Sequence, residues 1–378
     1  MYELSEEQKM LQQTVRQLAK DKVEPRAADI DASGEYPWDM FELLRDNDIL
    51  ALCFPEELDG AGADLLTVCL AIEELARVCT NTSLILGVCK LGSQPIMIAA
   101  NEEQLNKYIP PLAKGETQCA FGLTEPGAGS DAAAMSTKAV KKGDVYVVNG
   151  QKCFITNGGI ADTYSIFGKT DDSSGVKGIS AFIVEKDYPG FEVAKIEHKM
   201  GIRGSRTAEL VFTDMEVPAE NLLGKEGDGF KIAMMTLDRT RPSIGAQAVG
   251  IAQGALDHAV DYAKERVQFG GPIARLQGIQ FMIADMAMQV EAARHLVYRS
   301  AVMVESAGRE ASAVSAMAKC FASDVAMKVT VDAVQVLGGV GYMVEYPLER
   351  MMRDAKITQI YEGTNQIQRV VIARHLLR

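Results

Sequence analysis

The sequence predicts an α+β protein with a helical N-terminal domain, a small antiparallel, barrel-like β-domain and a C-terminal helical bundle. Apolar residues recur at helical spacing over the first ~115 residues and again after Gly229. Between these regions, short β-branched and aromatic runs alternate with turn residues, which is typical of strands. Because no long helix separates the short runs, an antiparallel sheet or barrel is favoured over a Rossmann fold. The expected domains are 1–116, 117–226 and 227–378.

The N-terminal domain is predicted to begin with an amphipathic helix. Ser5 and Gln8 have the spacing of a capping box, and Leu11, Val15 and Leu18 follow at helical intervals. After a loop at 56–62, further helices are expected at 65–78 and 102–112.

The middle domain is predicted from runs of strand-forming residues. Turn clusters separate these runs, including 142–144 and 171–175. The expected strands are 145–148, 164–167, 179–184, 191–194 and 210–212.

The C-terminal domain is predicted from three long stretches rich in Ala, Met, Leu and Val. They span 246–266, 279–305 and 314–337, and helices of this length usually pack as a bundle. The segment 238–242 carries three charges and a proline, which predicts a break in the helical pattern. It is either a solvated turn or an arm that binds a charged ligand.

The composition disfavours several classes of function. A net charge of −12 argues against nucleic-acid binding and against docking on anionic membranes. The seven cysteines form no CxxC pair and the four histidines have no metal-ligand spacing, so we expect neither disulfides nor a metal. The apolar stretches 84–89 and 96–100 are too short to span a bilayer, and no secretory signal is evident. These features indicate a cytoplasmic protein, of bacterial type.

The most informative residue is Glu362, which lies between Tyr361 and Gly363 and precedes the apolar run 370–373. Burial against apolar neighbours would raise the pKa of its carboxyl group, because burial penalises the charged form. A carboxylate of this kind is suited to proton abstraction near neutral pH.

A glycine-rich loop, Thr124 to Asp131, is the first candidate ligand site. Backbone N–H groups near closely spaced glycines can converge on a phosphate, and the hydroxyl groups add donors. The third glycine and the following helix of a dinucleotide fingerprint are missing, which disfavours a nicotinamide site. On the residues alone, an ordinary turn and a phosphate site both stay open.

Three further segments carry candidate ligand contacts. At 154–159 an aromatic residue beside a hydroxyl ends a strand and could flank a planar ring. Arg266 ends a predicted helix, where it could pair with a phosphate or complement the helix dipole. The segment 335–341 is typical of a helix C-cap, and its glycines would also let a ligand approach the backbone.

Together these motifs resemble the acyl-CoA dehydrogenase family from Leu4 to Leu377, and within it the short- and medium-chain, butyryl-CoA-dehydrogenase-like branch. The resemblance implies a C-terminal four-helix bundle, bound FAD and a homotetramer built as a dimer of dimers. It implies oxidation of an acyl-CoA thioester to trans-2-enoyl-CoA in β-oxidation, with electron-transferring flavoprotein as acceptor. It assigns Glu362 as the base that removes the pro-R α-proton while the β-hydride leaves to flavin N5. The backbone N–H of Glu362 and a flavin ribityl hydroxyl would polarise the thioester carbonyl. Some branches place the base at the position of Thr240, which leaves Glu362 as the candidate here.

The resemblance also implies FAD contacts in four groups. They are the glycine-rich loop, the 154–156 strand end with Thr156 beside N5, a set that reaches a neighbouring subunit's FAD, and two residues after the base. Many relatives have tryptophan at the position of Phe154, and some have a polar residue at that of Leu276. The implied FAD contacts are Phe121, Leu123, Thr124, Gly129, Ser130, Phe154, Ile155, Thr156, Arg266, Gln268, Phe269, Leu276, Gln277, Gln335, Gly338, Gly339, Thr364 and Gln366.

The implied substrate contacts lie around CoA and the thioester. The acyl cavity would be walled by 84–100, which is mainly apolar. The glutaryl branch has an arginine early in this region, but this chain has Thr80 to Ser83, so a dicarboxylyl-CoA is disfavoured. We expect a straight short- or medium-chain acyl group, and branched, alicyclic or aryl-propionyl groups stay open. The implied contacts are Ser130, Asp238, Arg239, Thr240, Arg241, Tyr361 and Gly363.

Three other functions are compatible with parts of this pattern. An enoyl-CoA reductase working in reverse with a bifurcating flavoprotein would use the same residues, so direction stays open. Acyl-CoA oxidases are usually longer and carry an extra C-terminal domain. A non-enzymatic acyl-CoA-binding role is disfavoured by the intact base and FAD motifs.

Overall fold

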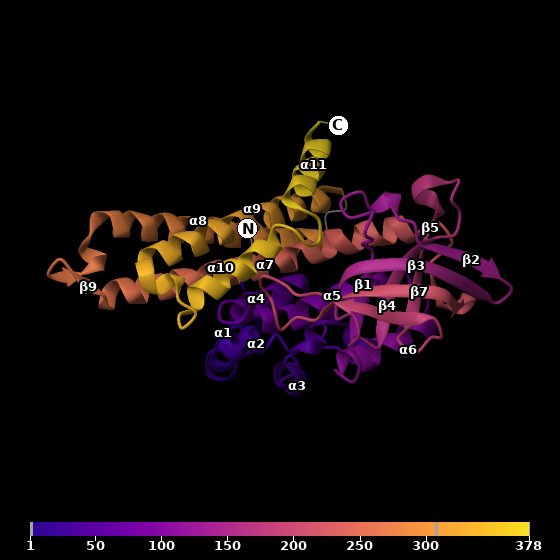
Figure 1. The fold of residues 1–378 in the computed structure, drawn as a ribbon, viewed down its shortest axis with the longest axis horizontal. Helices are drawn as coiled ribbons and strands as arrows, with labels where there is room; N and C mark the ends of the chain where they lie inside the picture. Colours follow the sequence, from indigo (N-terminus) through magenta and orange to yellow (C-terminus); the bar gives the residue numbers. More distant parts are fainter. Residues whose placement is uncertain (1–2, 307–308, 378) are drawn as a thin grey trace.

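The computed structural model describes residues 3–306 and 309–377. Figure 1 shows an elongated molecule, with the β-domain at one end and the long C-terminal helices extending away from it to the β9 hairpin at the other. The N-terminal helices lie along one side of the long helices. The expected α+β fold class is confirmed.

The N-terminal domain is helical because apolar residues line the inner faces of successive helices. The expected capping box is confirmed: Ser5 Oγ accepts from the Gln8 backbone N–H at 3.1 Å, and Gln8 Oε1 accepts from the Ser5 N–H at 3.0 Å. The α-helices are α1 Glu6–Leu18, α2 Ala27–Ser33, α3 Trp38–Asp46, α4 Leu65–Ala76, α5 Thr80–Ala99 and α6 Glu102–Ala113.

Helix α5 joins the apolar stretch at 84–89 and most of the stretch at 96–100 in one helix of 20 residues. Among the described residues it is the one helix long and apolar enough to cross a membrane, by length and composition alone. However, 72% of its apolar window is buried inside the protein, and it packs against α4, α7 and β1. A buried core helix passes the same test, so α5 is weak evidence for a membrane span.

The middle domain is one mixed sheet in the order β6-β7-β3-β2-β4-β5-β8, with β1 paired to β4. Most pairs are antiparallel as expected, but β1 runs parallel to β4, and β2 meets β4 in parallel at Lys138 and Lys169. The parallel pairing with β1 is possible because about 40 residues separate Gly122 from Thr163, enough for a crossover. The strands are β1 Cys119–Gly122, β2 Lys138–Lys142, β3 Val145–Thr156, β4 Thr163–Lys169, β5 Ile179–Glu185, β6 Phe191–Ile196, β7 Thr207–Pro218 and β8 Leu222–Leu223.

The C-terminal domain packs α7, α8, α9 and α10 together, and α11 contacts the N-terminal half of α9 and projects away from the bundle (Figure 1). A short β9–β10 hairpin joins α7 to α8, and a 3-10 helix, Gly338–Tyr342, follows α9. The elements are α7 Gly229–Glu265, β9 Val267–Gln268, β10 Gly271–Pro272, α8 Gln277–Ser306, α9 Arg309–Leu337, α10 Pro347–Thr358 and α11 Asn365–Leu376.

The break expected at 238–242 is wrong, because this segment lies inside the 37-residue helix α7. Two of the three charges that suggested a solvated turn are paired within the helix: Arg241 Nη1 donates to Asp238 Oδ1 at 2.7 Å, and Arg241 is only 3% exposed. Tertiary packing therefore outweighs the cost of Pro242 within a helix.

Candidate active site

Glu362 lies in the short loop between α10 and α11, in a turn that is unusual for a side chain of its size. Its φ is +52° and that of Gly363 is +93°, both in the left-handed region. Gln368 Nε2 donates to the carbonyl oxygens of both residues, at 3.2 and 2.8 Å, and Lys319 Nζ donates to Gly363 O at 2.8 Å. These bonds hold the strained turn, and therefore the base of the Glu362 side chain, in one position.

The Glu362 carboxylate meets polar groups from two long helices. Thr240 Oγ1, on α7, donates to Glu362 Oε2 at 2.6 Å. Burial raises the pKa of Glu362 to about 7, while the Thr240 hydroxyl, the Arg241 guanidinium and the Lys319 ammonium oppose that rise. The carboxylate can therefore accept a proton near neutral pH, as its sequence setting indicated.

The backbone N–H of Glu362 donates no hydrogen bond to any residue that the structure describes. Its neighbour Tyr361 is instead anchored at both ends, since its N–H donates to Ile357 O at 3.0 Å and its hydroxyl donates to Gln247. The free N–H is thus available to a ligand oxygen close to the carboxylate.

An apolar wall lies beside Tyr361. Leu84 and Val88 of α5 pack with Ile202, from the loop between β6 and β7, against Ile357 and Tyr361. This cluster brings together an N-terminal helix, a middle-domain loop and the C-terminal loop that carries Glu362.

A polar cross-link closes the same region. Gln247 of α7 accepts from the Tyr361 hydroxyl, and its amide donates to Ser83 Oγ of α5 at 3.0 Å. Apolar side chains and this cross-link together limit the room between α5 and α7.

The expected CoA-contacting residues of α7 are only partly available. Asp238 and Arg241 are paired with each other, and Ser312 Oγ donates to Asp238 Oδ1 at 2.9 Å. Burial lowers the pKa of Arg241 and raises that of Asp238. Thr240 is buried against Glu362, whereas Arg239 remains partly exposed. A ligand arm could thus reach Arg239, but the Arg241 guanidinium is turned to the protein interior.

The glycine-rich loop after β1 is anchored by residues that the sequence did not single out. Glu125 accepts from Lys152 Nζ at 2.7 Å, and both side chains are buried. Glu125 also accepts from the backbone N–H groups of Ser136 and Thr137, and the Lys152 charge lowers its pKa to about 2. Sequence alone does not distinguish a buried strand lysine from an exposed one, so nothing marked this pair in advance.

Ligand-binding groups are open on this loop and on the neighbouring strand end. Within the described chain, the hydroxyls of Thr124, Ser130 and Thr156 make no hydrogen bond to protein, and nothing lies within 4 Å of a Cβ built on Gly129. Phe154 sits at a bulge of β3 with φ of +59°, which leaves its ring 66% exposed. Free hydroxyls, open glycine backbone and an exposed aromatic ring fit a ligand with a flat ring and phosphates.

Other expected FAD contacts point elsewhere. Leu123 and Ile155 have buried side chains that pack in the core, so only their backbone could meet a ligand. Phe121 packs edge-on against Phe167, and the Thr364 hydroxyl caps α11 by accepting from Ile367 N–H at 3.4 Å. Gln366 is exposed.

The residues expected to reach a neighbouring subunit's FAD lie far from Glu362 of their own chain. Arg266 directly follows the last residue of α7 and comes 26 residues after Thr240, so the two residues are separated by about 39 Å along the helix axis. Figure 1 places the β9 hairpin at the opposite end of the molecule from the β-sheet. Phe269 there is 92% exposed. The exposed residues of the hairpin and its flanks include Arg266, Gln268, Phe269, Leu276 and Gln277, and Gln335, Gly338 and Gly339 are exposed at the C-terminal end of α9.

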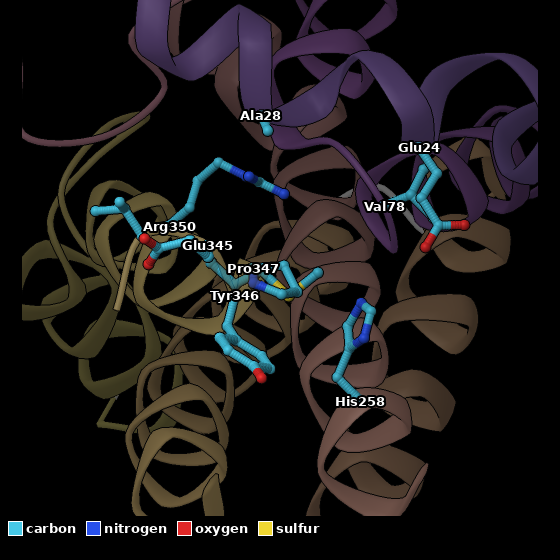
Figure 2. A pocket seen from close by; sticks show the side chains of 10 residues that line it. Glu24, Ala28, Val78, His258, Glu345, Tyr346, Pro347 and Arg350 are labelled. Atoms are coloured by element: carbon cyan, nitrogen blue, oxygen red, sulfur yellow. The ribbon is translucent and has the colours of Figure 1, made fainter. Parts of the chain in front are cut away.

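A cavity of about 220 Å³ lies apart from all of these residues. Figure 2 shows Glu24, His258, Tyr346 and Arg350 around it, where the N-terminal helical segment meets α7 and α10. Neither Glu362 nor any other expected site residue lines it.

Comparison with known proteins decides the family. The chain matches the models of the acyl-CoA dehydrogenase N-terminal domain over residues 5–116, the middle domain over 120–215 and the C-terminal domain over 227–377. The chain belongs to the acyl-CoA dehydrogenase family. It is therefore an oxidoreductase and a flavoprotein whose cofactor is FAD, as the sequence resemblance implied.

Relatives in this family match nearly the whole chain. An acyl-CoA dehydrogenase of Bacillus subtilis is 52% identical, with 99% of each chain covered. A short-chain-specific acyl-CoA dehydrogenase of Clostridium acetobutylicum is 50% identical, with 100% of each covered.

Solved structures of the family share the fold. Butyryl-CoA dehydrogenase from Megasphaera elsdenii has a TM-score of 0.97 and 47% identity, covering 100% of both chains. A chain from work on the electron transferring flavoprotein of Acidaminococcus fermentans and flavin-based electron bifurcation has a TM-score of 0.97 and 53% identity, again over 100% of both. Acyl-CoA dehydrogenase complexed with FAD from Bacillus anthracis has a TM-score of 0.91 and 36% identity, covering 100% of this chain and 68% of that one.

Proposed function

We propose that this acyl-CoA dehydrogenase converts a short, straight-chain acyl-CoA thioester to its trans-2-enoyl-CoA, with Glu362 as the base that removes the pro-R α-proton. The observation that carries the proposal is the Glu362 carboxylate, held on a strained turn, bonded to Thr240 and given a pKa of about 7 by burial. Burial, position and proton affinity are the properties that a general base needs.

The residues around Glu362 have separate tasks in this reaction. The proton moves from the α-carbon to the Glu362 carboxylate, which Thr240 keeps oriented through its 2.6 Å hydrogen bond. The unbonded backbone N–H of Glu362 donates to the thioester carbonyl and stabilises the negative charge that develops there. Bound FAD supplies the acceptor for the β-hydride. The free hydroxyls of Thr124, Ser130 and Thr156 and the Phe154 ring would hold it.

A short acyl group is supported by two kinds of observation. The Tyr361–Gln247–Ser83 cross-link and the side chains of Leu84 and Val88 restrict the space between α5 and α7. Two relatives of similar length are described as short-chain specific and as butyryl-CoA dehydrogenase. Because other relatives act on cyclohexane-type thioesters, alicyclic acyl groups belong in the same substrate test.

We infer that the active enzyme is a homotetramer, a dimer of dimers, in the cytoplasm. The β9 hairpin, which carries part of the implied FAD contacts, lies at the opposite end of the molecule from the β-sheet and presents exposed apolar side chains such as Phe269 and Val267. A neighbouring copy would bring this end to its FAD. Electrons would then pass to electron-transferring flavoprotein, which supports a place in β-oxidation.

The reverse reaction, reduction of an enoyl-CoA, is supported by one relative. The 53% identical chain comes from work on flavin-based electron bifurcation, so the same site could reduce an enoyl-CoA with electrons from a bifurcating flavoprotein. Assays run in both directions with each candidate acceptor or donor distinguish the two.

The proposed function is tested with Glu362→Gln and a panel of acyl-CoA substrates. We expect the variant to keep its FAD absorbance and fold but to lose turnover by a factor on the order of 10³, in the range of a lost general base. Glu345→Gln, an exposed carboxylate from the segment before α10, is the matched control and should retain activity. Butyryl-CoA should give the highest kcat/KM of the panel. Wild-type turnover in Glu362→Gln would show that the base is another group.

A further inference from the structure

Two lysines among the described residues are fully buried, and just one of these two has a carboxylate partner. Lys152 Nζ lies 2.7 Å from Glu125 in the middle domain. Lys319, on α9, is 0% exposed, and its Nζ donates to two neutral acceptors, Gly363 O at 2.8 Å and Asn365 Oδ1 at 3.0 Å. No carboxylate of the described residues lies within 4.0 Å of Lys319 Nζ.

A buried ammonium without an ion partner is unfavourable, so its presence needs a reason. The position adds to the cost, because Lys319 Nζ lies beside Asn365 at the N-terminal end of α11, where the helix dipole is positive. Burial lowers the pKa of Lys319 to about 7, and the charge of Glu362 is the strongest influence in the opposite direction. Holding the Gly363 carbonyl does not require a cation, because Gln368 Nε2 already donates to it at 2.8 Å.

The other charges around this site are already paired. Arg241, from α7, faces both Glu362 and Lys319 but is bonded to Asp238 at 2.7 Å. Asp324, one turn along α9 from Lys319, is bonded to Arg369 of α11 at 2.7 Å.

Two uncharged titratable groups complete the surroundings, Cys320 beside Lys319 and Tyr361 beside Glu362. Of the four charged groups that act on one another at this site, Arg241 and Asp324 have ion pairs, whereas Glu362 and Lys319 have none and the charge of each favours the charged form of the other.

We propose that Lys319 is a positioning residue for α-proton abstraction: its ammonium, bonded to the Glu362–Gly363 turn at Gly363 O, keeps the Glu362 carboxylate ionised until the substrate proton is transferred. The inference rests on the proposed role of Glu362 as the base. The proton goes from the α-carbon to the carboxylate, and Lys319 itself neither gives nor takes a proton in this step.

Two substitutions separate the charge of Lys319 from its hydrogen bonds. Lys319→Gln keeps a neutral donor near Gly363 O, and Lys319→Met removes the donor while filling similar space. Lys328→Gln is the control on the same helix, because Lys328 is an exposed lysine paired with Asp332 at 2.6 Å. FAD absorbance and Tm are measured first for each purified holoenzyme.

The deciding measurement is the pH profile of kcat with butyryl-CoA and an artificial electron acceptor. Losing the ammonium raises the pKa of Glu362, so the acidic limb of kcat should move up by about one pH unit in both Lys319 variants. At pH 7 kcat should fall about fivefold and recover at high pH, while KM and FAD content stay within about twofold of wild type. Exchange of the substrate α-hydrogen with deuterated water, measured without an acceptor, should shift in the same way. Lys328→Gln should match wild type.

Three results would overturn the inference. They are an unshifted pH profile in both Lys319 variants, a loss of kcat that is equal at every pH, and a loss that follows FAD content or Tm. An inactive Glu362→Gln combined with unshifted Lys319 variants would refute the role of Lys319 alone. An active Glu362→Gln would instead refute the proposed function.

Discussion

Removing the hydroxyl of Thr240 should change the pH at which the enzyme works. Thr240 Oγ1 donates to Glu362 Oε2 at 2.6 Å, and this bond favours the charged form of the carboxylate. Thr240→Val keeps the shape of the side chain in the buried face of α7 but removes the donor. The ionised Glu362 is therefore less stable in the variant, and its pKa rises above the value of about 7 in the native protein.

The size of the effect follows from the strength of one hydrogen bond to a charged group, about 1.5–3 kcal/mol. At 1.36 kcal/mol for each pKa unit, the pKa of Glu362 should rise by about one to two units. With a pKa near 7, about half of the enzyme carries the carboxylate at pH 7; after the rise, about 1–9% does. Because only the carboxylate accepts the α-proton, kcat at pH 7 should fall by about 5- to 50-fold.

The assay is kcat for butyryl-CoA between pH 6 and pH 10, at saturating substrate and with constant FAD content. The acidic limb should move to higher pH, and activity should approach the wild-type level once Glu362 is ionised again. Thr236→Val is the matched control, since Thr236 is buried one turn earlier on α7 and its hydroxyl has no hydrogen-bond partner in the described structure. A Thr240→Val profile that overlays those of the control and wild type would refute the reasoning.

Three other substitutions test the surrounding architecture. Lys152→Met leaves Glu125 charged and buried, so the free energy of unfolding in urea should fall by about 3–5 kcal/mol. A smaller loss would mean that Glu125 is stabilised by groups other than Lys152. Phe154→Ala should weaken FAD binding in a fluorescence titration while changing stability by less than about 0.5 kcal/mol, because the ring is exposed. Gln247→Ala removes the link between Tyr361 and Ser83, so kcat/KM for hexanoyl-CoA should rise relative to butyryl-CoA; an unchanged ratio would place the limit elsewhere.

Local patterns in the sequence predicted most of the fold, because capping and periodicity act over a few residues. The Ser5–Gln8 capping box and the five strand runs all appear in the structure. The predicted helix break at 238–242 was wrong because it rested on local signals alone. Charges and a proline favour a turn locally, but Arg241 pairs with Asp238 on the same helix and is buried in the protein interior. Propensity is a weak guide where tertiary packing decides.

The site was harder to predict than the fold, because burial of a charged side chain depends on contacts far apart in the chain. Glu362 stood out by its neighbours, but its partners Thr240 and Lys319 lie 122 and 43 positions away. Lys319 did leave a signal, since it is the one charged residue between Ala311 and Ser323. A lone lysine in a long apolar helical stretch indicates burial, and thus a partner to look for. The roles assigned to the FAD and CoA contacts remain predictions.

The geometry around Glu362 depends on packing remote from it. The left-handed turn at 362 costs roughly 1–3 kcal/mol, and a buried unpaired Lys319 adds to that cost. Helix α7, which carries Thr240, touches α4 at Gly250 and touches Arg77, the residue after α4, at Gly254. A Cβ atom built on Gly250 would lie 2.3 Å from Glu73 O, and one on Gly254 would lie 2.0 Å from Arg77 O. Because no side chain larger than hydrogen fits at that contact, α7 has little freedom to slide along α4. The distance between Thr240 and Glu362, and through it the proton affinity of the base, is therefore set partly by helix packing about 15 Å or more away along α7.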